Sequence, residues 1–184
     1  MLERNLAMIA LFAALIGALA FVPALTLLNG VPISAQSMGI MLMLAGAVLG
    51  PKRGALAVLL FLALVALGLP LLSGGRGGLG VFMGPTIGYL VAFPIGAFVT
   101  GWIAGQFRAP MSLPAVLTGA LISGVVIVNF IGALGMWWKL ETSFIGALAM
   151  TTPFLLGDII KAVLTAVITA AVAQARPSLI KQRA

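Results

Sequence analysis

The stretch PFLLGDIIKAVLTAVITAAVA, residues 153–173, decides the fold, because it is long and apolar enough to predict a membrane-spanning helix. Two charged residues, Asp158 and Lys161, interrupt it. They are three positions apart, so they share one face of a helix and can reach each other. Each charge costs roughly 2.5–3.5 kcal/mol near the centre of a bilayer helix, so an intramembrane charge indicates a functional site. The alternative interpretation is an ion pair that neutralises itself and only locks helix packing.

The composition indicates a polytopic helical membrane protein, because 62% of the 184 residues are hydrophobic and only 7% are charged. The sequence has no cysteine and no histidine, which excludes thiol nucleophiles, imidazole bases and the metal sites they form. The acids are Glu3, Glu141 and Asp158, too few for a carboxylate metal cage. A G-x-S-x-G nucleophile elbow is also missing. We therefore expect no enzyme, no metal and no cofactor.

Six apolar segments predict an all-α protein of six transmembrane helices, in a single transmembrane domain over residues 1–184. The segments are residues 5–28, 34–50, 55–69, 85–107, 114–137 and 152–175. The second and third are short for a span, so their full crossing stays open. The last begins at Thr152-Pro153, and a capping residue followed by proline is typical of a helix start.

Most basic residues fall on one side of the predicted membrane. Six spans place both chain ends on the same side, and seven of the ten basic residues lie there: Arg4, Lys52, Arg53, Arg108, Arg176, Lys181 and Arg183. The positive-inside bias predicts a multi-pass protein of the cytoplasmic membrane with both termini in the cytoplasm. The net charge of +7 follows this topology, so we expect membrane lipid around the chain and no nucleic acid.

Polar side chains from four predicted helices gather in the outer half of the membrane. At about 1.5 Å per residue, Tyr89 lies near the depth of Asp158, and Asn129 lies near that of Lys161. Gln36 lies near the outer end of the second segment, and a glycine-rich loop follows the third segment on the same side. The predicted substrate-binding residues are therefore Asp158, Lys161, Arg76 of this loop, Tyr89, Asn129 and Gln36.

Such a pocket, open to the outer face, complements a ligand with N–H donors, an apolar body and a carboxylate. Simpler roles stay open for the other polar residues. Tyr89 and Asn129 could bond neighbouring helices, Gln36 could cap its own helix, and Arg76 could be a solvated turn residue.

Six short stretches carry a family resemblance: VPISAQ (31–36), LGPKRGA (49–55), GLP (68–70), SGGRGG (73–78), GPTIGY (84–89) and GDIIK (157–161). In this order and spacing the sequence resembles BioY, the biotin-binding S components of energy-coupling factor (ECF) vitamin transporters. The resemblance implies the six-helix ECF S-component fold, with biotin bound from the outer face. It implies that Asp158 and Lys161 contact the head group or carboxylate of biotin, and that the loop 73–80 covers the pocket.

The resemblance also implies partners. Ala10, Ala14 and Ala18 form a small-residue stripe on the first segment, and in S components this stripe docks on the transmembrane coupling protein. The chain has no G-x-x-x-x-G-K-[ST] phosphate loop, so ATP hydrolysis requires partner ATPase subunits, unless the protein works alone and self-associates. A rival interpretation is an ion-coupled small-solute carrier or channel, in which Asp158 and Lys161 relay protons.

Overall fold

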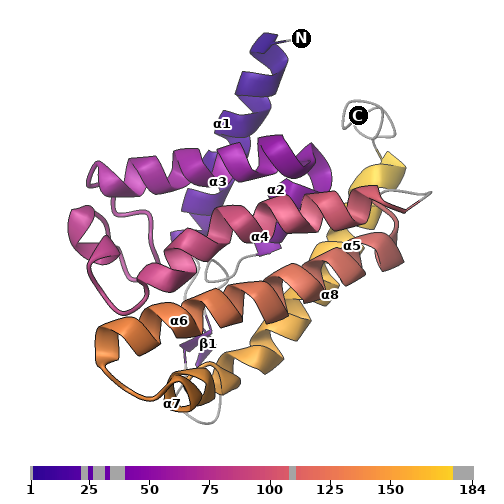
Figure 1. Ribbon diagram of the computed structural model, residues 1–184. Coiled ribbons are helices and arrows are strands. Elements are labelled where there is room, and N and C mark those ends of the chain that lie inside the picture. The colour runs from indigo at the N-terminus through magenta and orange to yellow at the C-terminus, as the bar shows by residue number, and fades with distance from the viewer. Residues whose placement is uncertain (1, 22–24, 27–31, 34–39, 108–110, 176–184) are drawn as a thin grey trace.

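The computed structural model describes residues 2–21, 25–26, 32–33, 40–107 and 111–175 (Figure 1). Helices dominate these residues, as the sequence predicts. The helices are α1 (Leu2–Ala18), α2 (Ile40–Leu49), α3 (Pro51–Ala66), α4 (Ile87–Gly105), α5 (Leu113–Ala120), α6 (Val128–Leu140), α7 (Phe144–Ala149) and α8 (Thr152–Ala175), with shorter turns η1 (Leu19–Phe21) and η2 (Leu79–Phe82). An antiparallel pair of two-residue strands, β1 (Leu25–Thr26) and β2 (Pro32–Ile33), departs from an all-α chain.

Helix α4 lies between α3 and the α5–α6 run, and glycines bring its backbone close to its neighbours (Figure 1). A Cβ built on Gly46 of α2 would lie 2.0 Å from the carbonyl oxygen of Ala97 in α4. A Cβ on Gly88 of α4 would lie 2.4 Å from the carbonyl oxygen of Ile131 in α6. Helices in lipid associate through close packing rather than through the hydrophobic effect, so small residues at these crossings hold the bundle together.

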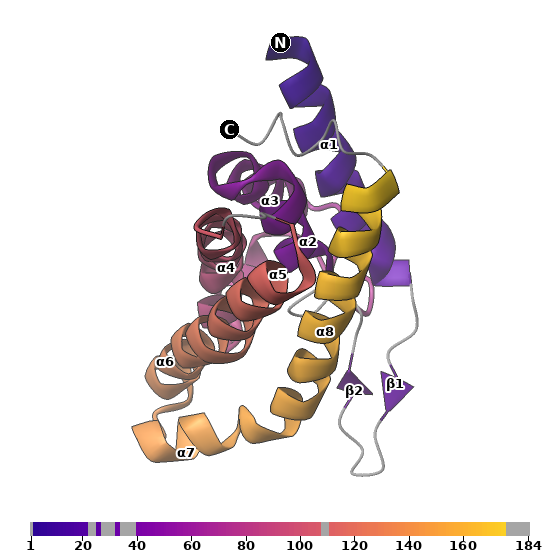
Figure 2. The same ribbon diagram turned by 90° about the vertical axis from the view of Figure 1, so that its right-hand side faces the viewer.

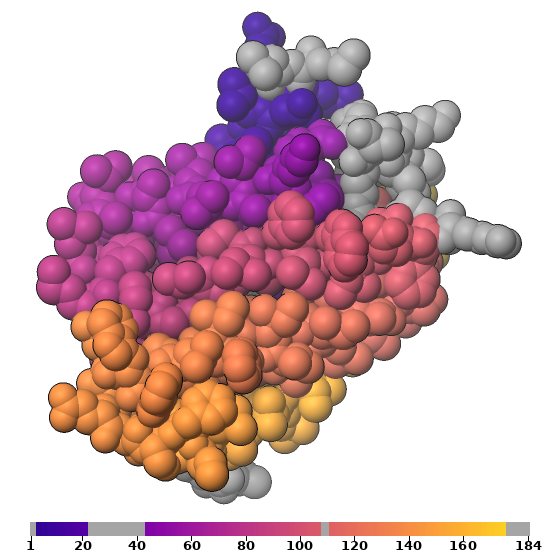
Figure 3. Space-filling model, in the orientation of Figure 1, coloured from indigo at the N-terminus to yellow at the C-terminus, as the bar shows by residue number. Residues whose placement is uncertain are grey.

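Large apolar side chains fill the space where α1, α3 and α4 meet. Ile16 of α1 and Phe61 of α3 are each 1% exposed, and they belong to one cluster with Val58, Val65 and Phe93. In the space-filling view the side chains of α3, α4 and α5–α6 form adjoining bands, and α8 shows only at the lower margin (Figure 3). Interlocking side chains of this size gain many dispersion contacts, so this side of the bundle is closely packed.

The predicted fifth segment is a helical run that changes its winding in the middle. Between α5 and α6, the segment η3 (Leu121–Ile127) has the wider π-helical winding, and the Val128 N–H bonds the Ser123 carbonyl five residues back. Buried pairs recur every four residues at 115–116, 119–120 and 123–124, and the next pair follows after five, at 128–129. The π segment therefore absorbs one extra residue and keeps the face of α6 turned into the bundle.

The two ends of the bundle differ. The start of α1 and the end of α8 lie at one end, called here the terminal end (Figure 2). The opposite end, the loop end, holds the residues between α3 and α4, helix α7 and the first turn of α8 (Figure 1). Trp137 and Trp138 lie near the end of α6, at the loop end, and the Trp137 ring lies 6.1 Å from that of Phe144. Trp102 lies toward the other end, where α4 gives way to α5.

Among the described residues, four helices are long and apolar enough to cross a membrane: Glu3–Phe21, Ile87–Gly105, Leu113–Leu140 and Thr152–Ala175. The last has the predicted start and end. The predicted count of six spanning helices is not confirmed, because α2 and α3 have only 10 and 16 residues. The first helical stretch ends at Phe21 in the described part of the chain, and Leu25–Thr26 form a strand, so the predicted extension of this helix to residue 28 is wrong. Helix α7 is not predicted from the sequence.

Candidate binding site

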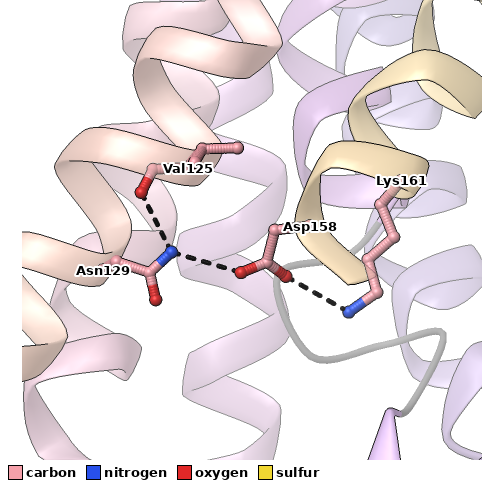
Figure 4. Close-up of polar contacts among 4 residues, drawn as sticks. All are labelled: Val125, Asn129, Asp158 and Lys161. Atoms are coloured by element: carbon pink, nitrogen blue, oxygen red, sulfur yellow. Dashed lines mark hydrogen bonds and ion pairs between the residues drawn. The ribbon is translucent and has the colours of Figure 1, made fainter. Parts of the chain in front are cut away.

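Asp158 and Lys161 form a buried ion pair on α8, as the sequence predicts (Figure 4). Lys161 Nζ lies 3.5 Å from Asp158 Oδ1, and their side chains are 7% and 1% exposed. Both therefore point into the bundle and away from lipid. A buried pair of this kind has lost most of its hydration, so it depends on neighbouring polar groups for further stabilisation.

Asn129 of α6 supplies one such group. Its Nδ2 donates to Asp158 Oδ2 at 3.2 Å and to the backbone carbonyl of Val125 at 2.9 Å (Figure 4). Both partners are acceptors, so they fix the amide orientation, with the nitrogen toward Asp158 and the oxygen turned away. The predicted convergence of Asn129 with the charged pair is therefore confirmed, and it joins α6 to α8.

Tyr89 of α4 lies on the same side of α6. Its ring covers Gly132, one turn beyond Asn129, since a Cβ on Gly132 would lie 2.4 Å from Tyr89 Cζ. Tyr89 of α4 therefore packs on α6 within one turn of the amide that contacts the ion pair of α8.

Several polar atoms of this cluster are buried without a hydrogen-bond partner among the described residues. They are Tyr89 Oη, Asn129 Oδ1 and Asp158 Oδ1, although the last keeps its electrostatic contact with Lys161. An unsatisfied buried polar group costs about 1–3 kcal/mol. Two acceptors and a hydroxyl in this condition are the expected features of a site that a polar ligand completes.

Of the other two predicted site residues, only Arg76 is described, and it does not join this cluster. Arg76 is exposed in a tight turn, where Leu72 and Arg76 exchange backbone hydrogen bonds and Arg76 Nε donates to the Ser73 carbonyl at 3.2 Å. The turn needs glycine, because Gly74 and Gly75 have φ of 81° and 70°. Gln36 lies outside the described residues, so the prediction for it stays untested.

A second buried polar contact is not predicted from the sequence. Thr100 of α4 and Ser123 of the π segment share a short hydroxyl–hydroxyl hydrogen bond, and Thr100 Oγ1 also bonds the Gly96 carbonyl at 2.8 Å. A void of about 10 Å³ adjoins Ser123, between Met43 and Phe93. This volume suits a single water molecule and not a vitamin. Lone threonine and serine residues in apolar helices give too weak a signal to single them out.

The three alanines of the predicted docking stripe all face outward. Ala10, Ala14 and Ala18 are exposed on α1, whereas Ala13 and Ile16 on its other face are each 1% exposed. The stripe is therefore open to a helix from outside this chain.

A charged, partly unsatisfied polar cluster inside a bundle of apolar helices is typical of membrane transport proteins. The chain belongs to the BioY family, which matches residues 2–178. This membership confirms the resemblance, and it confirms the expectation of a transport protein rather than an enzyme.

Three relatives illustrate the match. The biotin transporter BioY of Rhodobacter capsulatus is 50% identical, over 99% of this chain and all of the relative. The biotin transporter BioY of Rhizobium etli is 44% identical, over 97% of this chain and 98% of the relative. A crystal structure of the S component for biotin from an ECF-type ABC transporter superposes with a TM-score of 0.80 at 34% identity, covering 94% of this chain and 92% of the other.

Proposed function

We propose that this protein is the biotin-binding S component of an ECF-type transporter, and that the cluster of Tyr89, Asn129 and Asp158 binds the ureido ring. The observation that carries the proposal is the set of unsatisfied atoms: two acceptors and one hydroxyl. A cyclic urea presents two N–H donors and one carbonyl acceptor. The ring can therefore donate to Asn129 Oδ1 and Asp158 Oδ1 and accept from the Tyr89 hydroxyl.

The carboxylate of biotin needs a cation. Lys161 already contacts Asp158 at 3.5 Å, so the exposed guanidinium of Arg76 is the better partner for the carboxylate tail. The loop 73–80 then covers a pocket that opens to the outer face, with Gln36 at its rim. This arrangement supports high-affinity uptake, because ligand and loop together exclude water from the buried pair.

The partners follow from the exposed stripe of α1. Ala10, Ala14 and Ala18 give the close approach that helix packing in lipid favours, so they are the docking surface for the ECF coupling protein. ATPase subunits supply the energy. With α2 and α3 as short spans, the chain crosses the cytoplasmic membrane six times as one transmembrane unit and keeps both termini in the cytoplasm.

The test is calorimetric titration of the purified protein with biotin and two analogues. An analogue methylated on a ureido nitrogen should bind far more weakly, since it loses a donor and adds bulk between the two acceptors. The methyl ester of biotin should lose less affinity. Asp158→Asn should weaken biotin binding, whereas Glu141→Gln, which removes a carboxylate in the turn after α6, should not. Equal affinity for biotin and its N-methyl analogue contradicts the proposal.

A proton-coupled carrier is a second candidate, favoured by the burial of both members of the Asp158–Lys161 pair. It predicts solute uptake that a protonophore abolishes, with no tight biotin binding. Uptake of labelled biotin that persists after the proton gradient collapses, and that needs ATP, excludes it.

A further inference from the structure

A buried hydroxyl pair joins α4 to the π segment η3. Thr100 Oγ1 donates to the Gly96 carbonyl of its own helix at 2.8 Å, so the hydrogen bond that it shares with Ser123 Oγ is donated by the serine. Both residues are 0% exposed. Fully buried hydroxyls lose their hydration on folding, and only fixed partners replace the lost hydrogen bonds. The pair therefore holds α4 and η3 together at this point.

The π winding of η3 depends on contacts from outside the segment. Its sequence, LISGVVI, contains one glycine, one serine and four β-branched residues, which are weaker helix formers than alanine or leucine. A Cβ on Gly124 would lie 2.7 Å from the Met43 sulfur of α2, and a Cβ on Gly96 of α4 would lie 2.9 Å from Val128 Cγ2. This close packing and the hydroxyl pair together hold the segment between α2 and α4.

The winding decides where the Asn129 amide lies. In η3 the Ser123 carbonyl accepts from the Val128 N–H, five residues on, so this turn contains one more residue than a turn of α-helix. One residue corresponds to about 100° of rotation in an α-helix. If η3 returned to α winding while α5 kept its position, Asn129 would turn by this angle. The amide donates to Asp158 Oδ2 at 3.2 Å (Figure 4), and a turn of this size would break that bond.

A continuous chain of contacts thus leads from α4 to the ion pair of α8. It runs from Thr100 to Ser123 through the two hydroxyls, and from the Ser123 carbonyl to Val128 through the π hydrogen bond. Asn129 follows directly and contacts Asp158. Asn129 Oδ1, which has no hydrogen-bond partner among the described residues, therefore keeps its direction only while the π segment is held at its other end.

We propose that Thr100 and Ser123 are positioning residues of the ligand site. Their hydroxyl pair holds the π winding of η3, and this winding keeps the Asn129 amide against Asp158 with its oxygen free for the ligand. Neither residue belongs to the cluster of unsatisfied polar groups, so both act through Asn129. The inference rests on the proposed function for the role of Asn129 in binding.

The first test is calorimetric titration with biotin. Ser123→Ala removes one hydroxyl and leaves Thr100 its bond to the Gly96 carbonyl, so the fold should be preserved. Affinity should fall roughly two- to tenfold, the range for loss of one neutral hydrogen bond. Thr100→Val should have a similar effect, and Thr100→Ser, which keeps the hydroxyl, should bind like the unmodified protein. Thr118→Val is the control and should leave affinity unchanged, because the Thr118 hydroxyl bonds the Pro114 carbonyl within α5.

A double-mutant cycle separates positioning from a general structural role. Asn129→Ala removes the amide, so Ser123→Ala should weaken biotin binding no further in that background. Effects of the two substitutions that add overturn the proposal, and so does unchanged affinity in both Ser123→Ala and Thr100→Val. Full affinity in Asn129→Ala instead overturns the proposed role of Asn129 in binding.

A measurement without biotin observes the amide directly. The sequence has three asparagines, so protein with ¹⁵N-labelled asparagine gives three side-chain amide signals, and the signal lost in Asn129→Ala belongs to Asn129. Ser123→Ala should shift this signal and speed its exchange with deuterated solvent, whereas Thr118→Val should change neither. An unchanged signal in Ser123→Ala overturns the positioning. A shifted signal supports it even where the unmodified protein fails to bind biotin, a failure that overturns only the proposed function.

Discussion

Replacing Asp158 with alanine should weaken both the fold and ligand binding, and the structure gives the size of each effect. The Lys161 ammonium, with a side chain only 7% exposed, would lose the carboxylate 3.5 Å away. Removing one member of a buried ion pair costs about 3–5 kcal/mol of folding free energy. Asn129 would also lose its 3.2 Å hydrogen bond to the carboxylate, which adds about 0.5–1.5 kcal/mol. We therefore expect Asp158→Ala to be strongly destabilised in detergent.

The stability assay is thermal unfolding in detergent, followed by intrinsic fluorescence. The double variant Asp158→Ala/Lys161→Met should recover most of the lost stability, because the buried ammonium that lost its carboxylate is then gone as well. The isosteric Asp158→Asn keeps the shape and one oxygen acceptor, so it should be less destabilised than Asp158→Ala, although Lys161 loses the carboxylate charge in both variants.

Affinity is measured on Asp158→Asn, at a temperature well below the unfolding transition of this variant. Loss of one charge-assisted hydrogen bond costs about 1.5–3 kcal/mol, which corresponds to roughly 10- to 150-fold weaker biotin binding. The reasoning is wrong if Asp158→Ala has the same melting temperature as the unmodified protein and the double variant is no more stable than the single one. An undiminished biotin affinity in Asp158→Asn removes the carboxylate from the site.

Three further changes test other parts of the molecule. Gly88→Ala should lower the free energy of unfolding by about 1–3 kcal/mol, and with it the melting temperature, because the added Cβ would lie 2.4 Å from the backbone of α6. Gly80→Ala is the control and should leave stability unchanged, since nothing lies within 4 Å of its Cβ. Ala14→Trp on the exposed face of α1 should leave biotin affinity unchanged and lower uptake in cells that co-express the coupling complex; normal uptake contradicts docking through this stripe. Arg76→Ala should weaken binding of biotin but not of its methyl ester, and an equal loss for both ligands shows that Arg76 does not bind the carboxylate.

Charge and hydropathy were sufficient to predict α8 and its inward-facing ion pair. A carboxylate and an ammonium three residues apart in an apolar helix must turn inward together, and the structure has them paired. The convergence of Asn129 with this pair followed from depth, which was counted from Pro153 at the start of α8 and from Trp137 near the end of α6. The depth of a residue in the membrane does not determine, however, which way its side chain points around the helix axis. The one-residue step that turns Asn129 toward Asp158 arises from the π winding of η3, which hydropathy cannot detect.

The remaining differences have other physical causes. Helix α7 has six residues, and its only local signal is Ser143, whose hydroxyl accepts from the Gly146 N–H at 3.0 Å. So short a helix carries no periodicity that a sequence pattern could reveal. The position of Arg76 was assigned by its side of the membrane, but its turn is held by Leu72 and two left-handed glycines, which direct the side chain outward. Side of the membrane and direction of a side chain are separate questions.

The fluorescence of the three tryptophans can report how deeply the protein lies in the membrane. Trp102 lies where α4 ends and Trp137 and Trp138 lie where α6 ends, at opposite ends of the bundle, and all three are exposed to the surroundings. In vesicles with bromine on selected acyl carbons, quenching of their emission should therefore locate both edges of the hydrocarbon layer on the same molecule. A change in tilt on partner docking would then appear as opposite shifts in the two quenching depths.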